Sequence, residues 1–377
     1  MERVGLHVDD EQLARSVHGK LSCVDCHKDL AGKPLPHPKA TQKVDCAGCH
    51  QANNHFGAPD VNSRVTYADS VHGQAAARGD RDAPRCADCH GDHNILPPSN
   101  PDSPISRFSV AETCGRCHSN PGFVKRHHIT KGNIVDFQRS VHGQALIAKG
   151  LVVAAVCTDC HGVHDIHVGS DPRSSASRPH IPKTCGKCHL GIYRQYEAGI
   201  HGQAFARGVK EAPVCTDCHG EHNILPPEAS QSTINPLHVV KTCSHCHANV
   251  KIERAFGFPA QRLSTYLSSY HGIANSYGDI TVANCASCHG AHDILPSADP
   301  RSSINPKNIP ETCGRCHPGV GVKIALGSVH LLPSPQHDAI VYWVKLFYQI
   351  FVALLVASFI GQVLLDLLSY RRRRGEA

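Results

Sequence analysis

The residues with the clearest chemical potential are 20 cysteines and 30 histidines in a chain of 377 residues. Every cysteine belongs to a Cys-x-x-Cys-His motif, and none is left over. The cysteines are Cys23, Cys26, Cys46, Cys49, Cys86, Cys89, Cys114, Cys117, Cys157, Cys160, Cys185, Cys188, Cys215, Cys218, Cys243, Cys246, Cys285, Cys288, Cys313 and Cys316. The histidines that close the motifs are His27, His50, His90, His118, His161, His189, His219, His247, His289 and His317. Ten repetitions of one five-residue pattern point to ten copies of one ligand.

The motif predicts ten covalently attached c-type haems. Two thiols three positions apart lie on one helical turn and can bond to the two vinyl groups of one haem, and the adjacent imidazole becomes the proximal iron ligand. Zinc ribbons and disulfides also use paired cysteines, but neither explains a histidine after the second cysteine ten times in ten. Twenty cysteines exclude an ordinary cytosolic enzyme. Only 5% of the residues are aromatic, so haem is also expected to fill the interior.

The motifs occur in pairs, and the pair is an internal repeat. Four copies span residues 70–118, 140–189, 199–247 and 270–317, and in each the first cysteines of the two motifs are 28 positions apart. A shorter copy spans residues 16–50, and its first cysteines are 23 positions apart. It lacks the His-Gly-x-His element that begins at the last histidine of the first motif in the other copies. We number these copies repeats 1 to 5 in chain order. Five repeats of two motifs account for the ten predicted haems.

Two further histidines recur in the repeats and are predicted to be distal iron ligands. A His-Gly pair opens each repeat, and another histidine follows three positions after the first proximal histidine of repeats 2 to 5. The predicted distal ligands are His18, His72, His93, His142, His164, His201, His222, His271 and His292, with His37 supplying the one missing from repeat 1. One such histidine alone would more often be a structural residue, but nine in register favour ligation. The sequence does not show which histidine serves which iron.

The predicted fold is a multihaem cytochrome c: short α-helices and coil around stacked haems, with little or no sheet. Tyr67, Phe137, Tyr196 and Tyr266 stand five positions before an opening histidine and are expected on the helices that carry it, packed against a haem face or simply within the helix packing. Proline and small polar residues between the motifs indicate loops. The only methionine is Met1, so bis-His coordination and low reduction potentials are expected.

A C-terminal apolar segment predicts one transmembrane helix, over residues 341–368. Residues 346–365 carry no charge, Tyr342 and Trp343 stand at the start, and Arg371–Arg374 follow in the basic tail, residues 369–377. The positive-inside rule then places the C-terminus in the cytoplasm and the haem region in the periplasm, at the inner membrane. In the linker, residues 318–340, His330 and His337 could ligate the last haem or a cofactor of a partner. Residues 1–15 contain no signal peptide, so a leader is expected to be missing.

Residues 16–317 resemble multihaem c-type cytochromes of the cytochrome c3-like and decahaem groups. The membrane-anchored form is similar to respiratory proteins that pass electrons between the quinone pool and periplasmic or extracellular acceptors. The resemblance implies redox partner proteins, among them an integral quinol-oxidising or b-type cytochrome subunit. No basic run with interleaved aromatic residues suggests nucleic-acid binding. The alternative is a terminal reductase for nitrite, hydroxylamine or tetrathionate, with one open iron; no Cys-x-x-Cys-Lys motif is present, so an electron carrier is favoured over an enzyme.

Overall fold

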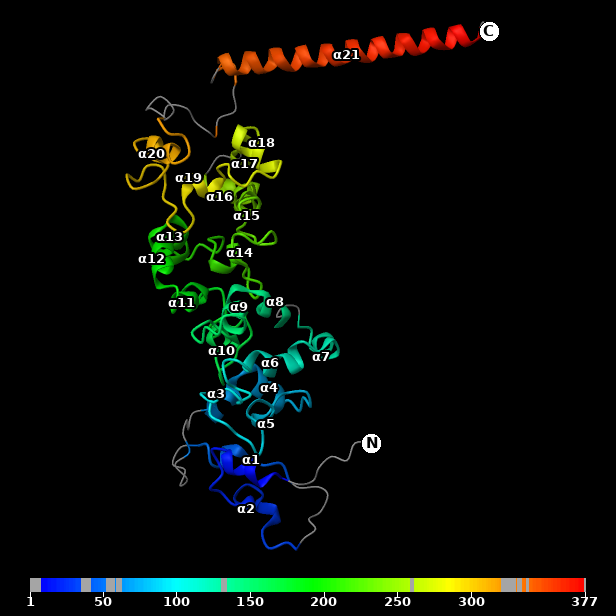
Figure 1. Ribbon diagram of the computed structural model, residues 1–377. Helices are drawn as coiled ribbons and strands as arrows, with labels where there is room; N and C mark the ends of the chain where they lie inside the picture. Colours follow the sequence, from blue (N-terminus) through cyan, green and yellow to red (C-terminus); the bar gives the residue numbers. More distant parts are fainter. Residues whose placement is uncertain are drawn as a thin grey trace. The chain divides into compact units, whose positions relative to one another are not determined.

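The protein is helical. The computed structural model describes residues 8–34, 42–51, 58, 63–129, 134–257, 261–319, 330, 334–336 and 339–375. All of these residues form helices, turns or coil, with no strand among them (Figure 1), which confirms the predicted secondary-structure class. The chain divides into two compact units, residues 1–242 with 289–302 and residues 243–288 with 303–377. Each unit contains parts of repeats 4 and 5.

The first motif of every repeat lies on a very short helix that begins at its first cysteine. These helices are α2 (Cys23–Cys26), α5 (Cys86–His90), α10 (Cys157–His161), α14 (Cys215–His219) and α19 (Cys285–His289). In α10, the carboxylate of Asp159, between the two cysteines, accepts a hydrogen bond of 2.8 Å from the backbone N–H of Val156 and so caps the helix. Gly162 ends the helix at φ 84°, a left-handed conformation that favours glycine. The sequence thus fixes both ends of the turn that presents two thiols and an imidazole.

A pair of helices precedes the first motif in repeats 2 to 5, and the second helix begins just before the opening histidine. The pairs are α3 (Ser63–Asp69) with α4 (Val71–Ala77), α8 (Ile134–Arg139) with α9 (Val141–Ile147), α12 (Leu190–Ala198) with α13 (Ile200–Ala206), and α17 (Arg262–Leu267) with α18 (Tyr270–Ser276). In repeat 3 the buried Ser140 caps α9 by accepting a hydrogen bond of 3.1 Å from Gly143. The expectation that the aromatic residue shares the helix of the opening histidine was wrong, because this serine breaks the helix between Phe137 and His142.

The aromatic residues of three repeats hold the helix pair against the first motif. The hydroxyl of Tyr196 donates a hydrogen bond of 2.9 Å to the carbonyl of Pro213, two residues before Cys215. Tyr67 and Tyr266 make the same bond to the carbonyls of Pro84 and Ala283.

The second motif begins a short 3-10 turn in repeat 1 and overlaps the C-terminal end of a longer helix in repeats 2 to 5. These elements are the 3-10 turn η2 (Cys46–Gly48), α6 (Val110–His118), α11 (Ile181–Gly186), α15 (Val239–His247) and α20 (Ile309–Gly314). The remaining helices before the membrane segment are α1 (Asp10–Arg15), η1 (Lys28–Leu30), α7 (Pro121–Arg126) and α16 (Val250–Phe256). Loops joining the two motifs are organised by buried serines, such as Ser103, whose hydroxyl donates to the Leu96 carbonyl at 3.0 Å. Such side-chain hydrogen bonds to the backbone stabilise the irregular segments between the motifs, where the sequence predicted loops.

Consecutive repeats of the larger unit are joined by one recurring backbone hydrogen bond. The residue before the opening histidine donates to the carbonyl of an isoleucine in the next repeat, two residues after the His-Gly-x-His element. The four bonds, of 2.7–2.9 Å, are Val17 to Ile95, Val71 to Ile166, Val141 to Ile224, and Ile200 to Ile294. Arg107 adds a contact from repeat 2 to repeat 3, donating at 2.7 Å to both Asp159 and the Ala154 carbonyl. Each repeat therefore docks its opening histidine beside the first motif of its successor.

Few apolar side chains are buried in this fold. One small cluster, at the contact of repeats 2 and 3, contains Val110, Leu146, Ala154 and Val156. Large apolar residues outside the membrane segment, such as Val153, stand exposed instead. A protein-only core this small contributes little hydrophobic stabilisation for a chain of this length.

The last helix, α21 (Ala339–Gly375), is long and apolar enough to cross a bilayer. An 18-residue window within its candidate span, Ala339–Arg372, has a mean hydropathy of 2.3, and no part of that window is buried. At 1.5 Å per residue, 20 residues already match the hydrocarbon thickness of about 30 Å. The predicted C-terminal apolar helix is confirmed, and it begins two residues earlier than the sequence indicated.

Candidate metal-binding histidine pairs

Eight motif histidines lie opposite a predicted distal histidine of the same compact unit. The ring centres lie 5.8–6.2 Å apart in the pairs His18–His50, His27–His93, His72–His118, His90–His164, His142–His189, His161–His222, His219–His292 and His271–His317. An imidazole nitrogen binds a first-row metal ion at about 2 Å and lies roughly 1.1 Å from its ring centre, so two rings on opposite sides of one ion are about 6.2 Å apart. The rings are therefore spaced as bis-His ligation of one iron requires.

The pairs follow two rules. The histidine of a second motif faces the opening histidine of its own repeat, as His189 faces His142. The histidine of a first motif faces the His-Gly-x-His element of the following repeat, as His161 in repeat 3 faces His222 in repeat 4. The backbone bond from Val141 to Ile224 holds the two repeats in this register.

The second rule changes the interpretation of repeat 1. His27 faces His93 of repeat 2, so repeat 1 has no need of a His-Gly-x-His element of its own. His37, the ligand predicted for that repeat, lies outside the described residues. His201 and His247 belong to different compact units. For His289 the second rule would require a sixth repeat, which the sequence does not contain.

The relative orientation of the two rings differs between the two kinds of pair. In the four pairs formed between repeats, the planes of the rings are 4–24° apart. In the four pairs formed within a repeat, the planes are 44–61° apart. The two kinds alternate along the chain, so the structure contains two classes of histidine pair.

Burial favours the neutral form of several of these imidazoles, the form that metal ligation requires. It lowers the pKa of His72, His142 and His161 below the ordinary value of 6.5, and the facing histidine lowers it further. A neutral ring offers a lone pair to a metal ion, whereas a protonated ring does not.

Cysteines of successive motifs also lie close together. Hydrogen bonds join the first cysteines of the second motif of one repeat and the first motif of the next, in the pairs Cys46–Cys86, Cys114–Cys157, Cys185–Cys215 and Cys243–Cys285. The bond from Cys46 lowers the pKa of the Cys86 thiol to about 6. Inside repeat 2, burial raises the pKa of Cys89, and the neighbouring Cys114 raises it further. Motifs 1 to 7 of the larger unit thus form an unbroken row of neighbours.

Glycine after the opening histidine is a packing requirement. A Cβ atom on Gly143 would lie 2.1 Å from the carbonyl oxygen of Phe137, and the equivalent distances at Gly73, Gly202 and Gly272 are 2.0–2.1 Å. The two helices of the pair therefore approach at this glycine, which places the histidine before it at a fixed position. This explains the recurring His-Gly, for which sequence reasoning gave no cause.

Two histidines outside the motifs and the predicted distal set, His180 and His238, have structural roles. The Nδ1 atoms of His180 and His238 each lie 2.9 Å from a serine carbonyl, of Ser174 and Ser232. These rings stabilise the loop before a second motif. They belong to neither kind of facing pair.

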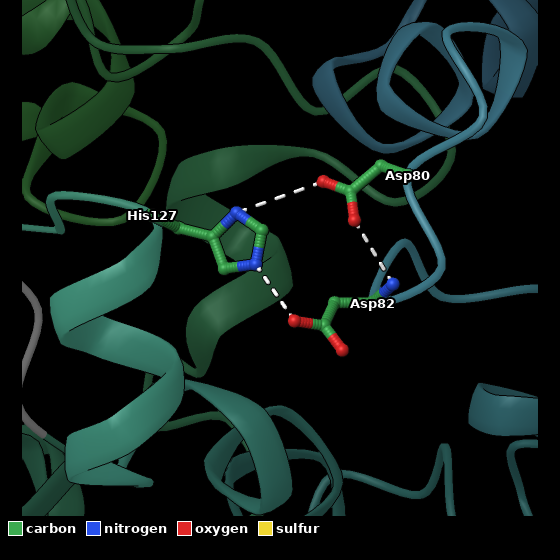
Figure 2. Close-up of side chains that lie close together, drawn as sticks. All are labelled: Asp80, Asp82 and His127. Carbon is green, nitrogen blue, oxygen red and sulfur yellow. Dashed lines mark hydrogen bonds and ion pairs between the residues drawn. The ribbon is translucent and has the colours of Figure 1, made fainter.

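A cluster that the sequence did not single out joins the loop after α4 to the end of α7 (Figure 2). The Nδ1 atom of His127 lies 3.6 Å from Asp80, and its Nε2 atom lies 3.1 Å from Asp82. Among the described residues this is the only group of three or more potential metal ligands whose ligand atoms all lie within 4.8 Å of one another, so no four-cysteine zinc site is formed there. Arg126 donates to Asp82 at 2.6 Å and opposes a cation at this position. We interpret the cluster as an ion-pair clamp.

In comparisons with protein-family models, curated proteins and solved structures, no match to the chain was found. The functional argument therefore rests on the residues and their geometry.

Proposed function

We propose that the chain is a ten-haem c-type cytochrome that transfers electrons from a quinol-oxidising membrane partner to periplasmic or extracellular acceptors. The observation that carries this proposal is the set of eight facing histidine pairs. Each combines the histidine of a Cys-x-x-Cys-His motif with a histidine from elsewhere in the chain, at the spacing of two ligands on one iron. A solely structural role would not require the same spacing eight times.

The chain's residues have defined tasks in this function. Bound haem would supply one-electron redox chemistry. The cysteines would bind the haem covalently, and the motif histidine and the predicted distal histidine would both bind its iron and leave no position open to a substrate. Two imidazoles, with no internal methionine to replace either, favour low potentials at the reducing end of a respiratory chain. Neighbouring motifs support passage of electrons along the row.

Helix α21 would hold the protein at the inner membrane. Arg371–Arg374 at its end favour a cytoplasmic C-terminus, and the haem region would then lie in the periplasm, where an integral quinol-oxidising or b-type subunit could reduce it. The apolar surface of the helix supports this anchoring.

The test is voltammetry of the full-length protein adsorbed on an electrode. An electron carrier is expected to show reversible reduction and oxidation over a broad range of low potential, unchanged by nitrite, hydroxylamine or tetrathionate. A catalytic current with any of these compounds would contradict the proposal and support the terminal reductase. That alternative requires one iron without a distal ligand.

A further inference from the structure

The haem of the Cys285–His289 motif needs a ligand from outside the repeats. In the four pairs formed between repeats, the first-motif histidine faces a histidine 61–74 positions further along the chain. The shortest separation is that of His161 and His222, and the longest is that of His90 and His164. The same interval after His289 falls within α21, which contains no histidine. Between the last motif and α21 the sequence contains two histidines, His330 and His337, and the second lies outside the described residues.

His330 is held as a metal-binding histidine is held. Its Nδ1 atom lies 3.0 Å from the hydroxyl oxygen of Thr265, a buried residue on α17. That hydroxyl lies 2.7 Å from the carbonyl of Gln261 and 3.0 Å from that of Arg262, so its proton goes to a carbonyl and its lone pair accepts from Nδ1–H. A ring with the proton fixed on Nδ1 presents a lone pair on Nε2, and such a second bond is the usual partner of a metal-bound imidazole.

The same helix lies beside the cysteines of the motif. Tyr266, next to Thr265, donates a hydrogen bond of 3.0 Å to the carbonyl of Ala283, two residues before Cys285. Burial raises the pKa of Tyr266 to about 12, and the nearby Cys285 and Cys288 contribute. Helix α17 thus connects the position of His330 with the cysteines that would hold the haem. Burial also lowers the pKa of His330, which favours the neutral ring.

We propose that His330 is the sixth ligand of the haem iron in the Cys285–His289 motif. The inference rests on the proposed function, since it requires haem at this motif. A residue before the membrane helix would then provide the distal ligand for the first motif of repeat 5, as the following repeat does for the first motifs of repeats 1 to 4.

The test compares full-length protein with His330→Ala, using His337→Ala as the matched variant. Haem content is measured by mass, spin state by absorbance and electron paramagnetic resonance, and open iron by carbon monoxide titration of the reduced protein. His330→Ala is expected to retain ten haems and bind one additional carbon monoxide per chain, and His337→Ala none. The additional site must disappear when Cys285→Ala and Cys288→Ala are combined with His330→Ala. His330→Met should instead move about one tenth of the haem to a higher potential through His/Met coordination.

Three results would overturn the inference. His330→Ala with ten low-spin haems would show that another residue is the ligand. One carbon monoxide bound by the unaltered protein, and lost on removal of Cys285 and Cys288, would show an open iron and support the reductase. An additional site that persists without those cysteines would assign His330 to another haem. Fewer than ten haems in the unaltered protein would instead refute the proposed function itself.

Discussion

Removal of His222 should open an iron in the preceding repeat and leave the haem of its own first motif intact. Its ring lies 5.8 Å from that of His161, with planes 4° apart, although His222 follows the Cys215–His219 motif directly in the sequence. His222→Ala removes one ligand from one iron in ten. About one tenth of the haem should therefore change from low to high spin, and the reduced protein should bind one additional carbon monoxide per chain. The exposed His128→Ala should change neither quantity.

The assignment to repeat 3 is tested by combining His222→Ala with removal of individual haems. With Cys157→Ala and Cys160→Ala, the additional carbon monoxide site should vanish, because the opened iron is no longer present. With Cys215→Ala and Cys218→Ala, it should remain. Non-additivity of this kind identifies the haem that depends on the histidine. The reverse pattern would show that His222 serves its own repeat, and the rule of pairing between repeats would be wrong.

Three further outcomes are expected. Electron paramagnetic resonance of the oxidised protein should show two classes of low-spin haem. The near-parallel histidine pairs between repeats should give rhombic signals, and the steeply inclined pairs within repeats should give strongly anisotropic signals. A single uniform class would contradict the two ring orientations. Gly143→Ala should destabilise the fold by about 1–3 kcal/mol, because the added Cβ would collide with the Phe137 carbonyl. Gly191→Ala is the control, because no atom lies within 4 Å of a Cβ added there. Equal thermal midpoints for the two variants would refute the packing argument. Leu355→Arg in α21 should oppose membrane insertion by about 2.5–3.5 kcal/mol and move the protein to the soluble fraction with its haem content unchanged. The control variant, Leu355→Phe, should stay with the membranes. Equal partitioning of the two variants would argue against a spanning helix.

The sequence predicted what is local and periodic. The motif helices, the all-helical class and the apolar C-terminal helix follow from patterns within one repeat or one segment, and the structure contains them. Such features need only nearby residues, so their spacing carries the information. The opening histidines of repeats 1, 2, 3 and 5 lie opposite the second-motif histidine of the same repeat, a pairing that the sequence did not specify.

The sequence did not reveal contacts that cross a repeat boundary. In the sequence, His93 directly follows the Cys86–His90 motif, and only the docking of repeat 1 on repeat 2 brings it to His27. For the same reason, the absence of His-Gly-x-His from repeat 1 looked like a missing ligand and directed attention to His37. Because each first motif pairs with the following repeat, the first motif that has no following repeat is that of repeat 5, not that of repeat 1. The break at Ser140 depends likewise on a helix contact that periodicity does not encode.

The proposed function requires ten irons in a single chain, each held between two imidazoles. Its most direct test is the mass of the mature, intact protein together with the spin state of its iron. The account predicts ten covalently bound haems per chain, all of them low-spin in the oxidised state and unreactive toward carbon monoxide when reduced. A mass that corresponds to fewer than ten haems would contradict it.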